Sequence, residues 1–304
     1  MPERSTIVVG TRASELAVVQ TAWVVAELSR RFATLRFELR KLSTRGDRDR
    51  QSPLSSMNVQ GVFTSELESA LLKRDIDVAV HSFKDLPTEV TEGLSVAAVP
   101  ERAGPYDVLV LRETGSLRKL PAGARVAAGS PRRRLALQCV RQDLDLVTVR
   151  GNVDTRLAKL TDGEYDALVM AQAALERLRR TEITESLENV MLPAAAQGAL
   201  AVQVRTEDEA TQRVVAVLND VRSACETTAE REVLRGLGGG CHLPLGVLAR
   251  ADELGNMTLR AQTYLAGEAR EFARQGKAAD ARELAGKLVD IMRRDFPDGL
   301  PEPG

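Results

Sequence analysis

The sequence predicts an α/β protein with two α/β domains and a smaller α+β domain at the C-terminal end. Two observations predict this class. Short apolar strand-like runs alternate with helical patterns over most of the chain, and several strand-like segments then follow one another near the end. The chain has 304 residues, of which 43% are hydrophobic and 28% charged. This composition is typical of a globular protein with a sizeable core.

The first α/β domain is expected over residues 1–100 together with 200–219. An apolar run, Ile7–Val9, predicts a strand that turns at Gly10. Ser14 is a plausible N-cap for the helix that follows, whose apolar face we expect to hold Leu16, Val19, Trp23 and Ala26. The later elements expected in this domain are a strand at 36–44, a polar loop at 45–61, a helix at 62–75, a strand at 76–80 and a strand at 198–205. Their order is typical of a mostly parallel sheet.

The second α/β domain is expected over residues 104–197. Ser130 followed by Pro131 predicts the start of a helix, because serine caps helices well and proline fits the first helical position. Strands are expected at 107–112, 124–130, 145–150 and 166–171, and helices at 132–142, 153–160 and 174–180. Residues 222–304 form the predicted α+β domain, with a helix at 223–237, strands at 243–250, 257–265 and 269–275, and a last helix at 281–296.

Charge and cysteine content exclude several classes of protein. A net charge of −1 argues against bulk attraction to nucleic acid or to a membrane surface. No apolar run approaches the ~18 residues of a membrane span, and the N-terminal residues lead directly into a strand, so no signal peptide is expected. The three cysteines form no C-x-x-C pair, which fits a reducing compartment, so we expect a cytoplasmic protein. A metal site at Cys241 and His242 is disfavoured because adjacent residues rarely bind one metal together.

Arginines gather where predicted strands end and helices open. They are Arg12, Arg132, Arg133, Arg150 and Arg156. Ligands of open α/β sheets bind outside the carboxyl ends of the strands, where helix N-termini also favour anions. The arginines therefore indicate an anionic ligand, although any one of them could simply be a solvated surface charge. No G-x-G-x-x-G or Walker A loop supports a dinucleotide or ATP.

Two further stretches carry candidate chemistry. In AVHSFKDLPTE (79–89), Asp85 closely follows a strand and could stabilise a cation or exchange a proton, or could merely organise the turn before Pro87. In GLGGGCHLP (236–244), three glycines precede Cys241. This stretch is either a mobile loop with an incidental cysteine or a loop that presents a sulfur for attachment.

Taken together, these stretches resemble the porphobilinogen deaminase family over nearly the whole chain. The resemblance runs through GTRASELAVVQ, STRGD, GVFTSELESALL, DVAVHSFKDLPTE, RGNVDTRLAKL, LPAAAQGALAVQVR and AEREVLRGLGGGCHLPLG. It implies two hinged α/β domains of the periplasmic-binding-protein type plus the smaller domain. It also implies an enzyme that joins four porphobilinogen molecules head to tail, with loss of ammonia, and then releases hydroxymethylbilane by hydrolysis. The sequence shows no heptads and no obvious apolar patch, so a monomer is expected.

The resemblance also implies roles for individual residues. Cys241 would carry a dipyrromethane cofactor through a thioether, and Asp85 would be the catalytic aspartate. Contacts to cofactor or substrate are implied for Arg12, Ser14, Gln20, Ser82, Lys84, Ser130, Arg132, Arg133, Arg150, Gly151, Arg156, Arg177 and Gln197. The chain departs from the family pattern at Ala128, where a hydroxyl is usual, and at Ser56 and Gln60, where lysines are common. These departures remove groups that would bind ligand carboxylates, so weaker binding of those carboxylates is expected.

Two other functions stay open on the residues alone. One is a non-catalytic, two-domain, hinged anion-binding protein, which would need neither Cys241 nor a third domain. The other is a cysteine hydrolase, which would need a histidine able to face Cys241; His242, adjacent in the sequence, is badly placed for that.

Overall fold

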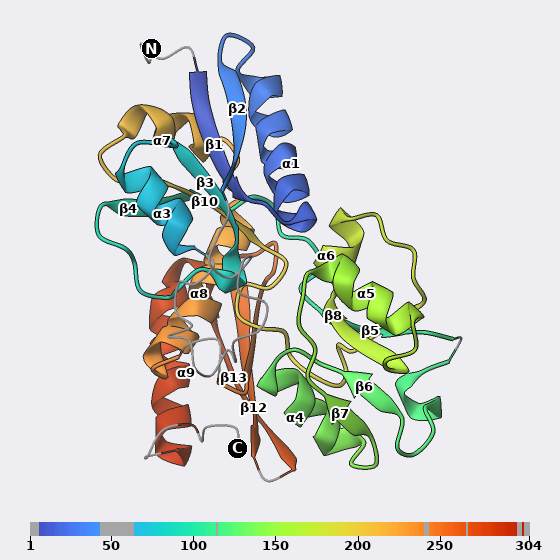
Figure 1. Cartoon of the computed structure of the whole chain (residues 1–304). Helices are drawn as coiled ribbons and strands as arrows, with labels where there is room; N and C mark the ends of the chain where they lie inside the picture. Colours follow the sequence, from blue (N-terminus) through green and yellow to red (C-terminus); the bar gives the residue numbers. More distant parts are fainter. Residues whose placement is uncertain are drawn as a thin grey trace. The chain divides into compact units, whose positions relative to one another are not determined.

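The computed structural model describes residues 6–42, 64–113, 115–239, 243–265, 267–296 and residue 300. The chain forms two compact units (Figure 1). Unit 1 comprises Met1–Ala103 and Ala199–Ala224, and unit 2 comprises Gly104–Gly198 and Cys225–Gly304.

Unit 1 contains a five-stranded sheet in the order β2-β1-β3-β10-β4. The strands are β1 (Thr6–Arg12), β2 (Arg36–Leu42), β3 (Val78–Ser82), β4 (Leu94–Ala98) and β10 (Leu200–Arg205). Strands β2, β1 and β3 run parallel, whereas β10 is antiparallel to both β3 and β4. The sheet is therefore mixed, and the prediction of a mostly parallel sheet holds only for its first three strands.

The described part of unit 1 contains the helices α1 (Glu15–Arg31), α3 (Ser65–Leu72) and α7 (Glu209–Ala216), and a 3-10 turn, η1 (Phe83–Asp85), follows β3. The predicted buried face of α1 is wrong. Gln20, Thr21, Val24 and Leu28 are buried, while Trp23 is 44% exposed. Two polar residues belong to the stripe that faces the sheet, so hydropathy alone placed the stripe on the wrong side of the helix.

The predicted turn at Gly10 is also wrong, because β1 continues through it to Arg12. A Cβ at Gly10 would lie 2.4 Å from Cδ1 of Ile76. The glycine therefore marks a close side-chain approach within the unit.

Unit 2 contains a second five-stranded sheet, in the order β7-β6-β8-β5-β9. Its strands are β5 (Asp107–Leu111), β6 (Arg125–Ala127), β7 (Asp145–Val147), β8 (Ala167–Ala171) and β9 (Thr184–Ser186), and its helices are α4 (Pro131–Val140), α5 (Val153–Thr161) and α6 (Gln172–Arg177), with a 3-10 turn η2 (Leu117–Lys119). The predicted start of α4 is confirmed, since Ser130 accepts a hydrogen bond from the Arg133 N–H and Pro131 is the first helical residue. Strands β4 and β9 were not predicted.

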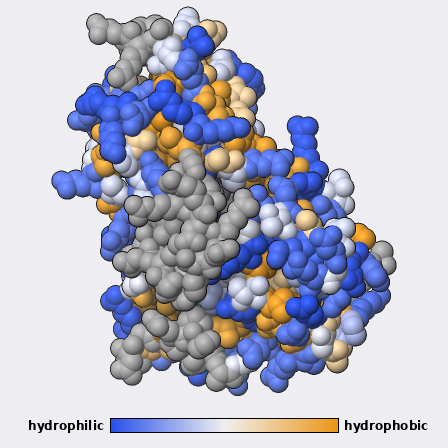
Figure 2. Space-filling model, viewed as in Figure 1, coloured by the Kyte–Doolittle hydropathy of each residue, from blue (hydrophilic) through white to orange (hydrophobic). Residues whose placement is uncertain are grey.

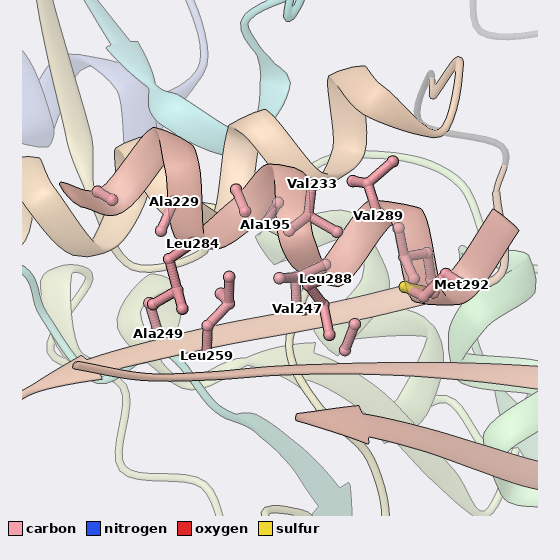
Figure 3. Close-up of a cluster of buried hydrophobic side chains, with 14 of the residues drawn as sticks. Ala195, Ala229, Val233, Val247, Ala249, Leu259, Leu284, Leu288, Val289 and Met292 are labelled. Carbon is pink, nitrogen blue, oxygen red and sulfur yellow. The ribbon is translucent and has the colours of Figure 1, made fainter. Parts of the chain in front are cut away.

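The C-terminal part of unit 2 is an α+β arrangement, as predicted. Strands β11 (Leu245–Ala251), β12 (Asn256–Leu265) and β13 (Glu268–Lys277) form an antiparallel sheet, which α9 (Ala281–Asp295) follows after the 3-10 turn η3 (Ala278–Asp280). Leu284, Leu288 and Met292 of α9 pack with Val233 of α8 (Val221–Gly236) and Leu259 of β12 in one buried cluster (Figure 3). This cluster is the core of the smaller part.

The predicted class, α/β with a smaller α+β C-terminal part, is thus confirmed, while the hinge and the domain limits stay predictions. Figure 2 shows hydrophilic residues over much of the visible face, with smaller hydrophobic areas between them. Among the described residues, no helix is long and apolar enough to cross a membrane.

Candidate functional site

One edge of the sheet in unit 1 brings two strand ends together. Strands β1 and β3 are parallel neighbours, with Val9 paired to Val78 and Gly10 to Ala79. Their carboxyl ends, Arg12 and Ser82, therefore lie at the same edge, which is where open α/β sheets bind ligands. Helix α1 and the turn η1 both begin directly beyond this edge.

A cavity of about 70 Å³ lies at this edge. Five residues with a predicted site role line it: Arg12, Ser14, Gln20, Ser82 and Asp85. The remaining lining residues are Leu16, Ala17, Thr64, Val80 and His81. The fold thus gathers residues from three separate stretches of sequence around one hollow.

The polar atoms around this cavity include both hydrogen-bond donors and hydrogen-bond acceptors. The Ser82 hydroxyl donates to Oε1 of Gln20 at 3.1 Å, which leaves the Gln20 amide nitrogen as the donor of that side chain. Asp85 is exposed and can only accept when ionised. The Thr64 hydroxyl is buried and has no hydrogen-bond partner among the described residues. Together with the guanidinium of Arg12, these groups suit a ligand that carries both carboxylates and N–H groups.

His81 adds a buried imidazole to the lining, at 5% exposure. Burial lowers the pKa of His81 to about 4; the hydrogen bond with Gln203 opposes this shift, and the nearby charge of Arg12 adds to it. The ring is therefore neutral at pH 7. Lys84, which is half-buried in η1, is not among the residues that line the cavity.

The sheet of unit 2 has a corresponding edge. Strands β6 and β7 are parallel, with Ala127 paired to Val147, and helices α4 and α5 begin beyond them. Nε of Arg156 donates to the Gly151 carbonyl at 2.8 Å, and a Cβ on Gly129 would lie 3.4 Å from Nη1 of Arg156. Gly151 has a φ of +105°, a backbone conformation that favours glycine.

The predicted residues of this edge are therefore brought together only in part. Ser130, Gly151 and Arg156 lie in the turns that open α4 and α5, with Arg150 preceding Gly151. Arg177 lies at the end of α6, where its Nη2 donates to the Gly198 carbonyl at 2.7 Å. Burial lowers the pKa of Arg177 to about 10, so it stays charged at pH 7.

Arg132 and Arg133 differ from the expectation of open anion receptors, because both are buried, at 4% and 6% exposure. Nη2 of Arg132 lies 2.7 Å from one oxygen of Asp107, and Nη2 of Arg133 lies 2.6 Å from the other. Arg132 also donates to the Leu192 carbonyl, and Arg133 to that of Val169. These guanidinium groups therefore already hold a protein carboxylate, and contact with a ligand stays a prediction.

Gln197 belongs to the same network. Its amide nitrogen donates to Asp107 at 3.0 Å and to the Pro105 carbonyl at 2.8 Å. Gln197 is 1% exposed, so its role as a ligand contact likewise stays a prediction.

Sequence reasoning missed Asp107, Glu68 and Gln203. Each is a polar residue inside an apolar pattern: Asp107 opens the strand DVLVL, Gln203 lies within LAVQVR and Glu68 within SELESALL. A polar side chain in such a position must find a buried partner, and that requirement was the available signal. Cys241, Ser56 and Gln60 lie outside the described residues.

A larger cavity, of about 430 Å³, has no residue with a predicted role among its described lining residues. It is bordered by α8 and α9 and is lined by Glu232, Arg235, Gly236, Arg282, Gly286, Val289, Asp290 and Arg293. Arg235 pairs with Glu232, and Arg293 donates to the Gly236 carbonyl. Arg235 and Arg293 of this cavity are therefore already bonded to Glu232 and to the Gly236 carbonyl at the end of α8.

Comparison with known proteins places these features in one family. Residues 7–213 match the family model described as porphobilinogen deaminase, dipyromethane cofactor binding domain, and residues 224–293 match the porphobilinogen deaminase C-terminal domain. The chain is 46% identical to the porphobilinogen deaminase of Deinococcus radiodurans over 80% of this chain and 81% of that one. It is 42% identical to that of Thermus thermophilus over 94% of each chain, and 40% identical to that of Syntrophus aciditrophicus over 96% of this chain and 99% of that one.

Among solved structures, the probable amino-acid ABC transporter extracellular-binding protein ytmK from Bacillus subtilis aligns with a TM-score of 0.42 at 13% identity. The alignment covers 71% of this chain and 90% of that one.

Proposed function

The chain belongs to the porphobilinogen deaminase family, and we propose that it joins four porphobilinogen molecules head to tail and releases hydroxymethylbilane. The observation that carries this proposal is the cavity in unit 1, where Asp85 and four predicted ligand contacts converge. A non-catalytic anion-binding protein is not favoured, because the relatives are named as deaminases.

The described residues fit a dipyrromethane cofactor, the group for which the matching family model is named. Such a group carries acetate and propionate side chains and pyrrole N–H groups. The cavity offers a guanidinium at Arg12 and an amide at Gln20 for carboxylates, and a carboxylate at Asp85 for N–H groups. It also holds the buried Thr64 hydroxyl, which has no hydrogen-bond partner in the described part of the chain. When bound, the cofactor supplies the pyrrole carbon to which the first substrate unit is joined, and Cys241 would hold it through a thioether.

Asp85 would carry the chemistry of each addition. The substrate's aminomethyl C–N bond breaks as ammonia leaves, a C–C bond forms, and the attacked pyrrole carbon loses its proton. The departure of ammonia leaves a cation on the substrate, which a carboxylate at the cavity wall stabilises. In its acid form the Asp85 side chain, exposed at the end of η1, can give a proton to the departing amine, and the carboxylate that this leaves can then take the proton from the pyrrole carbon.

The basic residues would hold the carboxylates of substrate and product. Lys84 and Arg12 lie at the edge of unit 1, whereas Arg150, Arg156 and Arg177 belong to unit 2. A hydrogen bond to a charged group contributes about 1.5–3 kcal/mol, so each receptor matters to elongation.

The test of this function combines intact mass with turnover. Protein purified without added cofactor should exceed its sequence mass by two condensed pyrrole units and should consume porphobilinogen. Cys241→Ser should lose both properties, whereas Cys139→Ala and Cys225→Ala should keep the added mass. An unmodified mass for active protein would refute the cofactor assignment.

The role of Asp85 needs its own variant. Asp85→Asn keeps the shape and removes the charge, so turnover should fall by more than ten-fold, equivalent to ~1.4 kcal/mol, while the fold is unchanged. Asp75→Asn, at an exposed position of the same unit, is the matched control and should turn over normally. Turnover above a tenth of wild type in Asp85→Asn would remove Asp85 from the catalytic role.

A further inference from the structure

Three buried polar side chains form a chain that ends at the cavity of unit 1. Nε2 of His81 lies 3.0 Å from Oε1 of Gln203, and Nε2 of Gln203 donates to Oε1 of Glu68 at 2.9 Å. The three residues are 5%, 3% and 9% exposed. His81 belongs to β3, Gln203 to the antiparallel neighbour β10, and Glu68 to α3.

The order of donors in this chain assigns the histidine proton. A carboxylate only accepts hydrogen bonds, so the amide nitrogen of Gln203 faces Glu68 and its oxygen faces His81. That oxygen also only accepts, so Nε2 of His81 must carry a proton. In a neutral imidazole the other nitrogen then has a lone pair and no proton.

The second ring nitrogen, Nδ1, has no hydrogen-bond partner among the described residues. Within the part of the chain that the structure describes, the His81 side chain makes no hydrogen bond other than the one to Gln203. The residue lines the same cavity as Asp85, Arg12 and Thr64. An acceptor directed toward a ligand is the role left for Nδ1.

We propose that His81 presents Nδ1 to the cavity as a hydrogen-bond acceptor for an N–H group of the bound pyrrole ligand. Gln203 and Glu68 are the positioning residues that fix its tautomer. The identity of the ligand rests on the proposed function, whereas the tautomer does not. A neutral acceptor suits this place because an imidazolium would oppose both Arg12 and the cation that forms during the reaction.

The tautomer can be tested on the wild-type protein as purified. The chain has only two histidines, so long-range ¹H–¹⁵N spectra of histidine-labelled protein are simple, and the signals lost in His81→Asn belong to His81. At pH 7 we expect a protonated Nε2 and an unprotonated Nδ1. An imidazolium, or a proton on Nδ1, would overturn the proposal.

The positioning residues are tested by the same spectra. Gln203→Leu should remove the bias and let the ring populate both tautomers. Gln212→Leu, which removes an amide of the same unit that bonds to the Arg205 and Thr206 carbonyls, should leave the His81 signals unchanged. An unchanged tautomer in Gln203→Leu would refute the positioning role.

The acceptor role is tested by two substitutions that separate the ring nitrogens. Asparagine places an amide oxygen near the position of Nδ1, whereas glutamine reaches the position of Nε2 and leaves nothing at Nδ1. We expect kcat/KM for porphobilinogen to fall roughly ten-fold in His81→Gln, as for a lost hydrogen bond, and less in His81→Asn.

The outcomes separate the two proposals. If the wild-type chain does not consume porphobilinogen, the proposed function fails while the tautomer result stands. If it does, and His81→Gln matches it in kcat/KM, only the acceptor role fails. Should His81→Gln not fold, the wild-type spectra still decide the tautomer.

Discussion

Replacing Asp107 by asparagine should destabilise unit 2 far more than the loss of one ordinary ion pair would. The Asp107 carboxylate accepts hydrogen bonds from both buried arginines and from Gln197, at 2.6–3.0 Å. Its side chain is fully buried, and those of Arg132 and Arg133 are 5% and 8% exposed. Water therefore cannot take over the solvation of the two guanidinium groups once the carboxylate is gone.

The size of the effect follows from this geometry. An asparagine oxygen could still accept from Arg133, but its amide would then point at Nη2 of Arg132, 2.7 Å from the present oxygen, and donor would face donor. Two buried cations would also lose their counter-charge. Removing one partner of a buried pair costs about 3–5 kcal/mol, and we expect Asp107→Asn to fall in that range.

The assay is amide hydrogen exchange of the peptides that contain β5 and β8, where Asp107 is paired with Ala171. A loss of about 3–5 kcal/mol corresponds to exchange that is faster by two to almost four powers of ten. The control is Glu164→Gln, which breaks the exposed pair with Lys159 and should cost about 1 kcal/mol or less. Equal exchange in the two variants would show that the buried network contributes no more than a surface pair.

Three further predictions concern stability. His81 resists protonation when folded, with a pKa of about 4 against 6.5 when unfolded, so stability should be full above pH 6.5 and fall by about 3 kcal/mol toward pH 4. Urea unfolding, followed by the fluorescence of Trp23, the single tryptophan of the chain, would measure this loss of stability. His81→Gln should remove the loss, and an equal loss in that variant would show that His81 is not its source. Ala196 has a φ of +59°, so Ala196→Gly should stabilise the protein by about 1 kcal/mol and raise its melting temperature. A melting temperature below that of the wild type would show that the backbone at Ala196 is unstrained. A Cβ on Gly246 would lie 2.5 Å from a backbone oxygen, so Gly246→Ala should cost about 1–3 kcal/mol in thermal unfolding, whereas Gly286→Ala, in open space on α9, should gain about 1 kcal/mol; the opposite order would refute the contact argument.

The secondary structure could be predicted wherever the signal is local. Ser130 and Pro131 mark the start of α4 by chemistry that needs no tertiary contact. The three strands before α9 were predicted from alternation alone, and β11–β13 lie within a few residues of the expected ranges. The buried face of α1 could not be predicted in this way, because Gln20 and Thr21 face the sheet for reasons that lie elsewhere in the chain.

The strand ends indicated the arginines and Asp85, the resemblance supplied the other candidate contacts, and the structure adds how these residues are grouped. Arg12, Asp85 and Ser82 come from different stretches, and only the parallel pairing of β1 with β3 brings them to one cavity. The sequence alone could not separate Arg12 from Arg133, since each lies where a strand gives way to a helix. What separates them is the buried Asp107, which lies on β5 of the same sheet and pairs with Arg133.

In each unit a buried aspartate forms an ion pair with a buried arginine. In unit 1, Arg205 at the end of β10 is 3% exposed and pairs with Asp77 at 2.8 Å, while it also donates to the carbonyls of Leu71 and Ile76. In unit 2, Asp107 meets two arginines, so those three groups together carry one positive charge. A charge held at low dielectric is screened less by salt than a surface charge is. We therefore expect Arg132 and Arg133 to attract a polyanionic ligand through their field, even though their guanidinium groups are already bonded to Asp107. Arginine suits these buried positions because it stays charged there, whereas the pKa of a buried lysine shifts readily.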